Sequence, residues 1–388
     1  MTTKISPIYL DYNATTPCDP RVVEKMLPYF YETYGNPSNG LHIQGRKSAK
    51  AVDVAREQIA DLIGARSNEI VFTSGATESN NLAILGLARF RQNVQRKRIV
   101  TCVIEHKAVL LPCKKLKEEG FDVVFLPVDK NGRVVLEEAR NSIDDNTLLV
   151  SIQGANNEIG TLQPIKELAE LAHQHGALFH SDAAQAVGKV PVSVDDWEVD
   201  LLSLSAHKFY GPKGVGALYI RGGTGAIPLE PIGYGGGQES GLRSGTTNVP
   251  SIVGLGEPSK LTKSTLNDEA VRVLEIRNQI ESQITSRIPL SKINGVLSDR
   301  LPNTTSITFQ DVDADALIYN APDIMIGTGS ACTSGAIEPS HVLTALGLSR
   351  EDASSTIRIS LGRYNRKDEI HTITESVVDA WSNLVKKQ

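Results

Sequence analysis

Two charged side chains in the middle of the chain, Asp182 and Lys208, are of the types that hold a reactive cofactor. Each follows a short apolar run, residues 177–181 in the first case and residues 201–204 in the second. Apolar runs of this length predict buried strands, and open α/β sheets bind their ligands at the carboxyl ends of such strands. A lysine can form a Schiff base there while a carboxylate pairs with a pyridinium nitrogen, so the pair predicts a pyridoxal phosphate site.

Taken singly, the two residues have more ordinary interpretations. Asp182 alone would be a helix N-cap, and Lys208 alone would be a solvated loop lysine. Ser205 and His207 lie next to the lysine in the sequence. This clustering of polar residues favours the cofactor site.

Polar residues also follow the other expected strands, as they would around a site at one edge of a sheet. Residues 74–77 open an expected helix whose N–H groups could bind a phosphate, with an ordinary Ser/Thr helix cap as the alternative. His106 could stack on a cofactor ring and shuttle protons, or it could be a core histidine. Asn157 and Arg358 are candidates for binding a substrate carboxylate, although Arg358 could instead form a surface salt bridge.

Cys332 differs in its setting from the other three cysteines. It lies in the glycine-rich segment 327–335, whereas Cys102 is expected in a strand and Cys113 in a helix, where a free cysteine behaves as a small apolar residue. Cys18 lies in a turn flanked by proline and stays undecided. A thiol on a mobile loop suits a nucleophile that must travel, so Cys332 is a candidate catalytic residue.

Expected strands alternate with expected helices through most of the chain, which predicts an α/β fold with a mostly parallel sheet covered on both faces. The strands are expected at residues 69–73, 98–104, 123–128, 147–152, 177–181, 201–204 and 215–220, with helices at 20–34, 48–63, 77–91, 109–119 and 165–175. After residue 245, a long charged helix over 267–286 leads to a second lobe. That lobe is expected to contain strands at 304–309 and 356–360 and a final helix at 367–385.

The composition is that of an ordinary soluble globular protein. The 388 residues include 40 basic and 45 acidic ones, and the net charge of −5 offers no basic field for nucleic acid or an anionic membrane. The sequence shows no signal peptide and no apolar run as long as a membrane span, so a cytoplasmic location is expected. The four cysteines lack CxxC pairing and metal-ligand spacing, so neither a metal site nor a disulfide framework is predicted.

Together these residues resemble the cysteine desulfurases of the NifS/IscS class, a group within the aminotransferase class-V branch of fold-type-I pyridoxal phosphate enzymes. The resemblance covers nearly the whole chain and rests on motifs at residues 10–16, 35–38, 73–79, 105–106, 157–160, 182–185, 205–208, 243–246, 329–332 and 358–362. It implies a large cofactor-binding domain over 16–260 with a seven-stranded, mostly parallel sheet. Residues 1–15 and 261–388 would form a smaller α+β domain that carries the catalytic cysteine loop at 327–339.

The resemblance also implies a role for each site residue. Lys208 would be the Schiff-base lysine, Asp182 the pyridinium partner and Gln185 the donor to the ring oxygen. His106 would stack on the ring and act as acid and base, and Cys332 would attack the substrate thiol. The phosphate would be bound by Ala76, Thr77, Ser205, His207 and, across a dimer interface, Thr246, and the substrate carboxylate by Asn157 and Arg358.

The activity implied by the resemblance is removal of sulfur from L-cysteine, which gives L-alanine and a persulfide on Cys332. The loop around Cys332 resembles that of the group with a long, mobile catalytic loop. A homodimer and a sulfur-acceptor protein are the expected partners, for iron–sulfur cluster assembly, tRNA thiolation or DNA phosphorothioation. The chain ends at Gln388, whereas the housekeeping bacterial members continue into a longer tail that docks an iron–sulfur scaffold, so the acceptor stays open.

Other functions are compatible with parts of the pattern. A class-V aminotransferase or a selenocysteine lyase would keep Lys208 and Asp182, but transamination has no use for a loop thiol such as Cys332. A catalytically silent binding module of a sulfur-transfer complex would not need these three residues or His106 intact. The four residues therefore favour the desulfurase.

Overall fold

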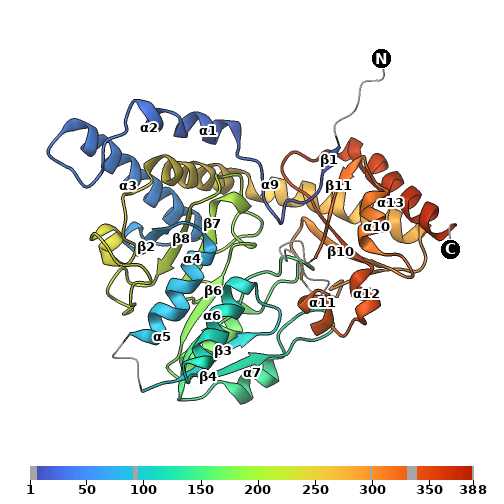
Figure 1. Cartoon of the computed structure of the whole chain (residues 1–388), viewed down its shortest axis with the longest axis horizontal. Coiled ribbons are helices and arrows are strands. Elements are labelled where there is room, and N and C mark those ends of the chain that lie inside the picture. Colours follow the sequence, from blue (N-terminus) through green and yellow to red (C-terminus); the bar gives the residue numbers. More distant parts are fainter. Residues whose placement is uncertain (1–6, 91–94, 298, 330–338, 387–388) are drawn as a thin grey trace.

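A seven-stranded sheet forms the centre of the larger lobe in the computed structural model, which describes residues 7–90, 95–297, 299–329 and 339–386 (Figure 1). The strands lie in the order β2-β8-β7-β6-β5-β3-β4. Their bounds are β2 (Ile70–Thr73), β3 (Arg98–Cys102), β4 (Asp122–Leu126), β5 (Thr147–Ser151), β6 (Leu178–Asp182), β7 (Leu201–Ser205) and β8 (Gly216–Ile220). Only the pairs that β8 forms with β2 and β7 are antiparallel among the strands of this sheet. The predicted mostly parallel seven-stranded sheet is confirmed.

Both faces of the sheet are buried, which explains why its strands are apolar runs without alternation. Neighbouring residues of β7 belong to different cores: Leu201 packs in one hydrophobic cluster and Leu202 in another. Successive side chains of a strand point to opposite faces, so each face has its own core. The helices of this lobe are α3 (Ile43–Ile63), α4 (Ala76–Asn81), α5 (Leu87–Arg89), α6 (Lys107–Glu118), α7 (Leu136–Ser142) and α8 (Ile165–Gln174).

The long helix α9 (Val249–Arg287) begins 18 residues before residue 267, where the sequence predicted its start. Gly254, Gly256 and Pro258 in this extra part suggest a loop from sequence, but they lie inside the helix. A side chain at Gly256 would place its Cβ 2.6 Å from the Cα of Ala55, so the glycine allows α9 to pack closely on α3. Figure 1 shows α9 running from α3 into the C-terminal lobe, so it connects the two lobes.

The smaller lobe has an antiparallel sheet in the order β12-β13-β10-β9 and a parallel pair, β1 with β11. Its elements are β1 (Ile8–Tyr9), β9 (Ser291–Ile293), β10 (Thr304–Phe309), β11 (Ile324–Met325), β12 (Gly327–Thr328), β13 (Thr356–Ser360), α10 (Ala314–Tyr319), α11 (His341–Ala345), α12 (Arg350–Ser354) and α13 (Ile370–Val385). Leu10 packs in one core with Ile276 and Ile359. We therefore propose that the chain divides into domains 16–260 and 1–15 plus 261–388.

The expected helix at 20–34 is two short helices, α1 (Pro20–Met26) and α2 (Pro28–Tyr31). Leu27 separates them, and Pro28 follows it, so the backbone N–H that a continuous helix would need at this position is missing. Across the described part of the chain, no helix is both long and apolar enough to cross a membrane.

Candidate active site

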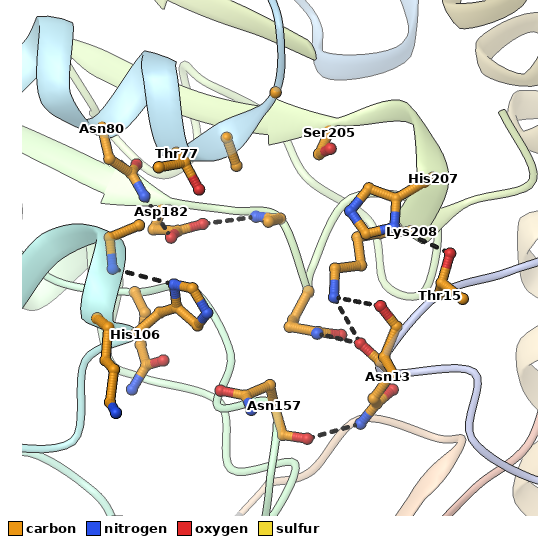
Figure 2. Close-up of a pocket in the computed structure, with 18 of the residues that line it drawn as sticks. Asn13, Thr15, Thr77, Asn80, His106, Asn157, Asp182, Ser205, His207 and Lys208 are labelled. Atoms are coloured by element: carbon orange, nitrogen blue, oxygen red, sulfur yellow. Dashed lines mark hydrogen bonds between the residues drawn. The ribbon is translucent and has the colours of Figure 1, made fainter. Parts of the chain in front are cut away.

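A cavity of about 490 Å³ opens where the parallel strands end (Figure 2). Sites for cofactors and small molecules commonly measure roughly 300–1,000 Å³. The predicted site residues that line the cavity are Ala76, Thr77, His106, Asn157, Asp182, Gln185, Ser205, His207, Lys208 and Arg358. Residues separated by up to 282 positions in sequence, from 76 to 358, therefore meet at one edge of the sheet.

Two predicted site residues are not among those that line the cavity. Thr246 is exposed in the described chain. Cys332 lies outside the described residues. Gly329 and His341, which stand on either side of the segment that contains it, both line the cavity.

Lys208 follows β7 in a single 3-10 turn, Ala206–Lys208. Its Nζ donates hydrogen bonds to the backbone oxygens of Asn13, at 2.6 Å, and Ala14, at 3.0 Å. Both acceptors belong to the N-terminal arm, which is fixed to the same turn because Thr16 N donates to His207 O at 2.9 Å. The arm thus holds the amine at the cavity wall (Figure 2).

Asp182 ends β6 and is 7% exposed. Its carboxylate accepts hydrogen bonds from Asn80 Nδ2 at 2.7 Å and from Ala184 N at 3.0 Å. Both donors are neutral, and a buried carboxylate is stabilised most by a hydrogen-bonded cation. A protonated pyridine nitrogen is such a cation. Figure 2 shows Asp182 and His106 on one side of the cavity and Lys208 and His207 on the other, so a pyridoxal ring between them fits this set of donors and acceptors.

His106 is the N-cap of α6, and its Nδ1 accepts a hydrogen bond from Ala108 N at 3.1 Å. The protein packed around the ring lowers the pKa of His106, against the opposing effect of Asp182. The imidazole is therefore neutral at pH 7. Because Nδ1 is the acceptor, the proton resides on Nε2, which makes Nε2 a hydrogen-bond donor.

Ser205, His207 and the first turn of α4 also line the cavity. Gly75 precedes α4 with φ +153°, and the N–H groups of Ala76 and Thr77 are in the first turn, where an α-helix has no backbone acceptors for them. Burial, followed by the charge of Lys208, lowers the pKa of His207 to about 4. A neutral histidine, a hydroxyl and unpaired helical N–H groups together suit a phosphate group.

Arg358 lies in the middle of β13 and is 3% exposed, so the salt bridge that it forms with Asp11 is a buried one and not the surface salt bridge of the alternative. Its Nη2 donates to Asp11 Oδ1 at 2.6 Å and its Nη1 to Asn157 O at 3.1 Å. Its Nε is buried and has no hydrogen-bond partner among the described residues. The Arg358 residue also lines the cavity, and a guanidinium is a planar donor pair, so Arg358 is suited to bind a carboxylate that enters there.

Asn80 and His341 line the cavity but were not singled out from sequence, whereas Glu158 was expected there only as part of the motif at residues 157–160. Asn80 lies one helical turn after residues 76–77, and this spacing could have suggested that it faces the same site. Glu158 accepts a hydrogen bond from Ser340 Oγ, and His341 Nε2 lies 3.0 Å from Glu105 O. Glu158 and His341 meet only through the tertiary fold, so no local signal could have paired them.

The aminotransferase class-V family model matches residues 8–373, so the chain belongs to this family. Among curated relatives, it is 47% identical over 373 residues to cysteine desulfurase IscS of Anaeromyxobacter sp. (strain Fw109-5), covering 96% of this chain and 92% of the relative. A solved NifS-like protein has a TM-score of 0.90 at 39% identity, with 97% of this chain and 100% of that chain covered. The structure described as SspA in complex with cysteine has a TM-score of 0.81 at 40% identity, with 92% and 100% covered.

The predicted class is thereby confirmed: the chain is a fold-type-I, pyridoxal phosphate-dependent enzyme of the cysteine desulfurase group. The residues that line the cavity fit this cofactor, since the cavity joins a lysine, a buried carboxylate and a set of phosphate donors. The individual role of each residue is taken up below as a proposal.

The bond from Asn80 to Asp182 generates a prediction. We expect Asn80→Ala to raise the dissociation constant of pyridoxal phosphate about tenfold, because a hydrogen bond to a charged group contributes about 1.5 kcal/mol. The measurement is a titration of the cofactor-free protein with pyridoxal phosphate, followed by absorbance. Asn81→Ala is the matched control, since Asn81 Nδ2 bonds to Thr77 O instead. Equal losses in both variants would contradict a specific role for Asn80.

Proposed function

We propose that the residues around the cavity act together to remove sulfur from L-cysteine and transfer it to Cys332. The observation that supports this proposal most is the position of described residues on both sides of the Cys332 segment. Gly329 and His341 line the same cavity as Lys208, Asp182 and Arg358. A side chain at Gly329 would place its Cβ 2.2 Å from Glu158 Oε2, so the chain enters this segment in direct contact with the cavity wall.

In this proposal three side chains hold the pyridoxal part of the cofactor, and a further set of residues holds its phosphate. Lys208 Nζ binds it covalently, Asp182 pairs with its ring nitrogen and Gln185 donates to its ring oxygen. The phosphate is bound by Ala76, Thr77, Ser205, His207 and, from the second subunit, Thr246. When bound, pyridoxal phosphate withdraws electrons from the substrate and so weakens its Cα–H and Cβ–S bonds.

The chain's own residues bind the substrate and move its protons. Arg358 binds the carboxylate of cysteine with its guanidinium group, Asp11 keeps that group in place, and Asn157 contributes from the cavity wall. The amine of Lys208 would accept the Cα proton, and His106 would donate and accept protons through Nε2.

The thiolate of Cys332 then attacks the substrate sulfur. The Cβ–Sγ bond of cysteine breaks, an Sγ–Sγ bond to Cys332 forms, and the carbon skeleton leaves as alanine. Atoms balance without an added oxidant, since the persulfide sulfur and the alanine together account for the substrate cysteine.

A sulfur-acceptor protein is the proposed partner, for iron–sulfur cluster assembly or for thiolation of tRNA or DNA. The relatives' name IscS favours iron–sulfur assembly. A cytoplasmic location is part of the same proposal.

The proposed homodimer is supported by exposed apolar side chains in the segment from α1 through α2 to the start of α3. They are Val23 (40% exposed), Leu27 (45%), Phe30 (60%), Tyr31 (64%), Tyr34 (71%), Leu41 (94%) and Ile43 (58%). Apolar surfaces of this extent usually pack against a partner. Figure 1 shows α1 and α2 on the outer side of the larger lobe, where a second copy can reach them.

The desulfurase step is tested with Cys332→Ala. We expect this variant to form alanine from L-cysteine at least about a hundredfold more slowly than the wild type in the presence of a thiol reductant, because the nucleophile is absent. Its cofactor absorbance should stay unchanged. Cys18→Ala is the matched control, since Cys18 is a free, partly exposed cysteine that does not line the cavity. Alanine formation at the wild-type rate by Cys332→Ala would refute the proposal.

The dimer is tested by introducing charge into the exposed apolar surface. We expect the double variant Phe30→Glu/Tyr31→Glu to sediment as a monomer of 42.0 kDa, whereas the wild type sediments as a dimer. Burying two carboxylates without partners opposes association. Tyr319→Glu is the control, because Tyr319 is 87% exposed on α10 in the other lobe. A monomeric wild type, or a double variant that remains dimeric, would contradict this interface.

A further inference from the structure

A second lysine, Lys189, lies beside the active site and has no role in the mechanism above. The residue is half-buried, and its Nζ contacts two residues of the cavity wall, Asn13 and Gln185. It donates hydrogen bonds to Asn13 Oδ1, at 3.0 Å, and to Gln185 Oε1. Lys189 is therefore connected to a residue that lines the cavity, although it does not line the cavity itself.

The contact with Lys189 decides which way the Gln185 amide faces. A glutamine amide can present either its oxygen or its NH₂ group, and only the neighbouring groups fix the choice. Lys189 supplies hydrogen-bond donors, so the Gln185 oxygen turns toward it. Gln185 Nε2 then donates to Asn13 O at 2.9 Å, and the amide has a second N–H for the cavity that Gln185 lines.

The frame around this amide is rigid. Asn13 O accepts hydrogen bonds from both Gln185 Nε2 and Lys208 Nζ. The Asn13 side chain is held in turn by Thr304 Oγ1, at 2.8 Å, and by Asn303 Nδ2, at 3.1 Å. The Gln185 amide cannot rotate without breaking bonds to Lys189 and Asn13.

The surroundings of Lys189 are mostly cationic or neutral. Burial first, and then the charges of Lys208 and Arg358, lower the pKa of Lys189 well below that of a free lysine. Tyr12, Tyr210 and Glu269 face it across a small cavity of about 30 Å³ that Lys189 and Lys208 also line. Only two N–H donors are needed for the bonds to Gln185 and Asn13, and a lysine amine has two whether or not it is charged.

We propose that Lys189 is a positioning residue that fixes the Gln185 amide with its NH₂ group toward the cavity, and thereby makes Gln185 a permanent donor to the ring oxygen of the cofactor. The inference rests on the proposed role of Gln185. It predicts that Lys189 influences the cofactor through Gln185 and not through its own charge.

The test is a pH titration of the absorbance of the cofactor-loaded protein, compared between the wild type, Lys189→Met, Gln185→Leu and the double variant. A donor at the ring oxygen stabilises its anionic form, so losing the donor raises the midpoint of the spectral transition. We expect Lys189→Met and Gln185→Leu each to shift the midpoint upward by about one pH unit, since one unit corresponds to about 1.4 kcal/mol, close to one hydrogen bond to a charged group. The double variant should shift no further than Gln185→Leu alone.

Lys213→Met is the matched control for charge, because Lys213 is an exposed lysine that lines the cavity without contacting Gln185. Its midpoint should stay close to that of the wild type. If Lys189→Met leaves the midpoint unchanged, or shifts it equally in the Gln185→Leu background, the proposal is overturned.

Lys189→Gln provides a second variant if Lys189→Met does not fold or bind the cofactor. It keeps N–H donors but removes the charge, so we expect a midpoint near that of the wild type, and a shift as large as that of Gln185→Leu would overturn the proposal. The titration needs no substrate. A wild type that forms no alanine would refute the desulfurase proposal alone, whereas an active wild type whose Lys189 variants titrate normally would refute only the positioning role.

Discussion

The hydrogen bonds of Asn13 connect the two lobes, and the shape of the active site depends on them. Asn13 N and Nδ2 donate to Ser360 Oγ and Thr304 Oγ1 in the smaller lobe, while Asn13 O accepts from Lys208 and Gln185 in the larger one. A movement of either lobe would therefore displace the groups proposed to hold the cofactor. The parallel sheet brings the side chains that follow its strands to one edge. The N-terminal arm lines the same cavity with Asn13, Ala14 and Thr15.

Charge is arranged across this cavity in a way that matches a zwitterionic substrate and an anionic cofactor. Arg358 is buried, is paired with Asp11 and lines the cavity. Lys208 is held by neutral backbone oxygens, and Asp182 by neutral donors. Charged groups in a site of low dielectric interact strongly with ligands of opposite charge.

The sequence placed most of the proposed site residues at the edge of the sheet where the cavity lies, because its signals are local. Asp182 and Lys208 follow short apolar runs, and in a parallel sheet the ends of such runs must meet. The extra turns of α9 were not predicted, since glycine and proline usually end helices and only the contact with Ala55 explains Gly256. Lys189 and Asn13 are separated by 176 residues and meet only through the tertiary fold, so no spacing rule could have paired them. Lys189 viewed alone would be a solvated lysine, which is the usual state of this residue type.

The proposed mechanism depends on Lys208 as the residue that binds the cofactor covalently. Lys189 is proposed only to position the Gln185 amide. Both amines donate hydrogen bonds to Asn13, so either lysine lies close to the site. The test must therefore identify which lysine is attached to the cofactor. The measurement is reduction of the cofactor-loaded protein with borohydride, which makes the lysine–cofactor link permanent, followed by peptide mass spectrometry. The account predicts the added cofactor mass on the peptide that contains Lys208 and none on the peptide that contains Lys189. Cofactor attached to Lys189, or to any other lysine in place of Lys208, would contradict it.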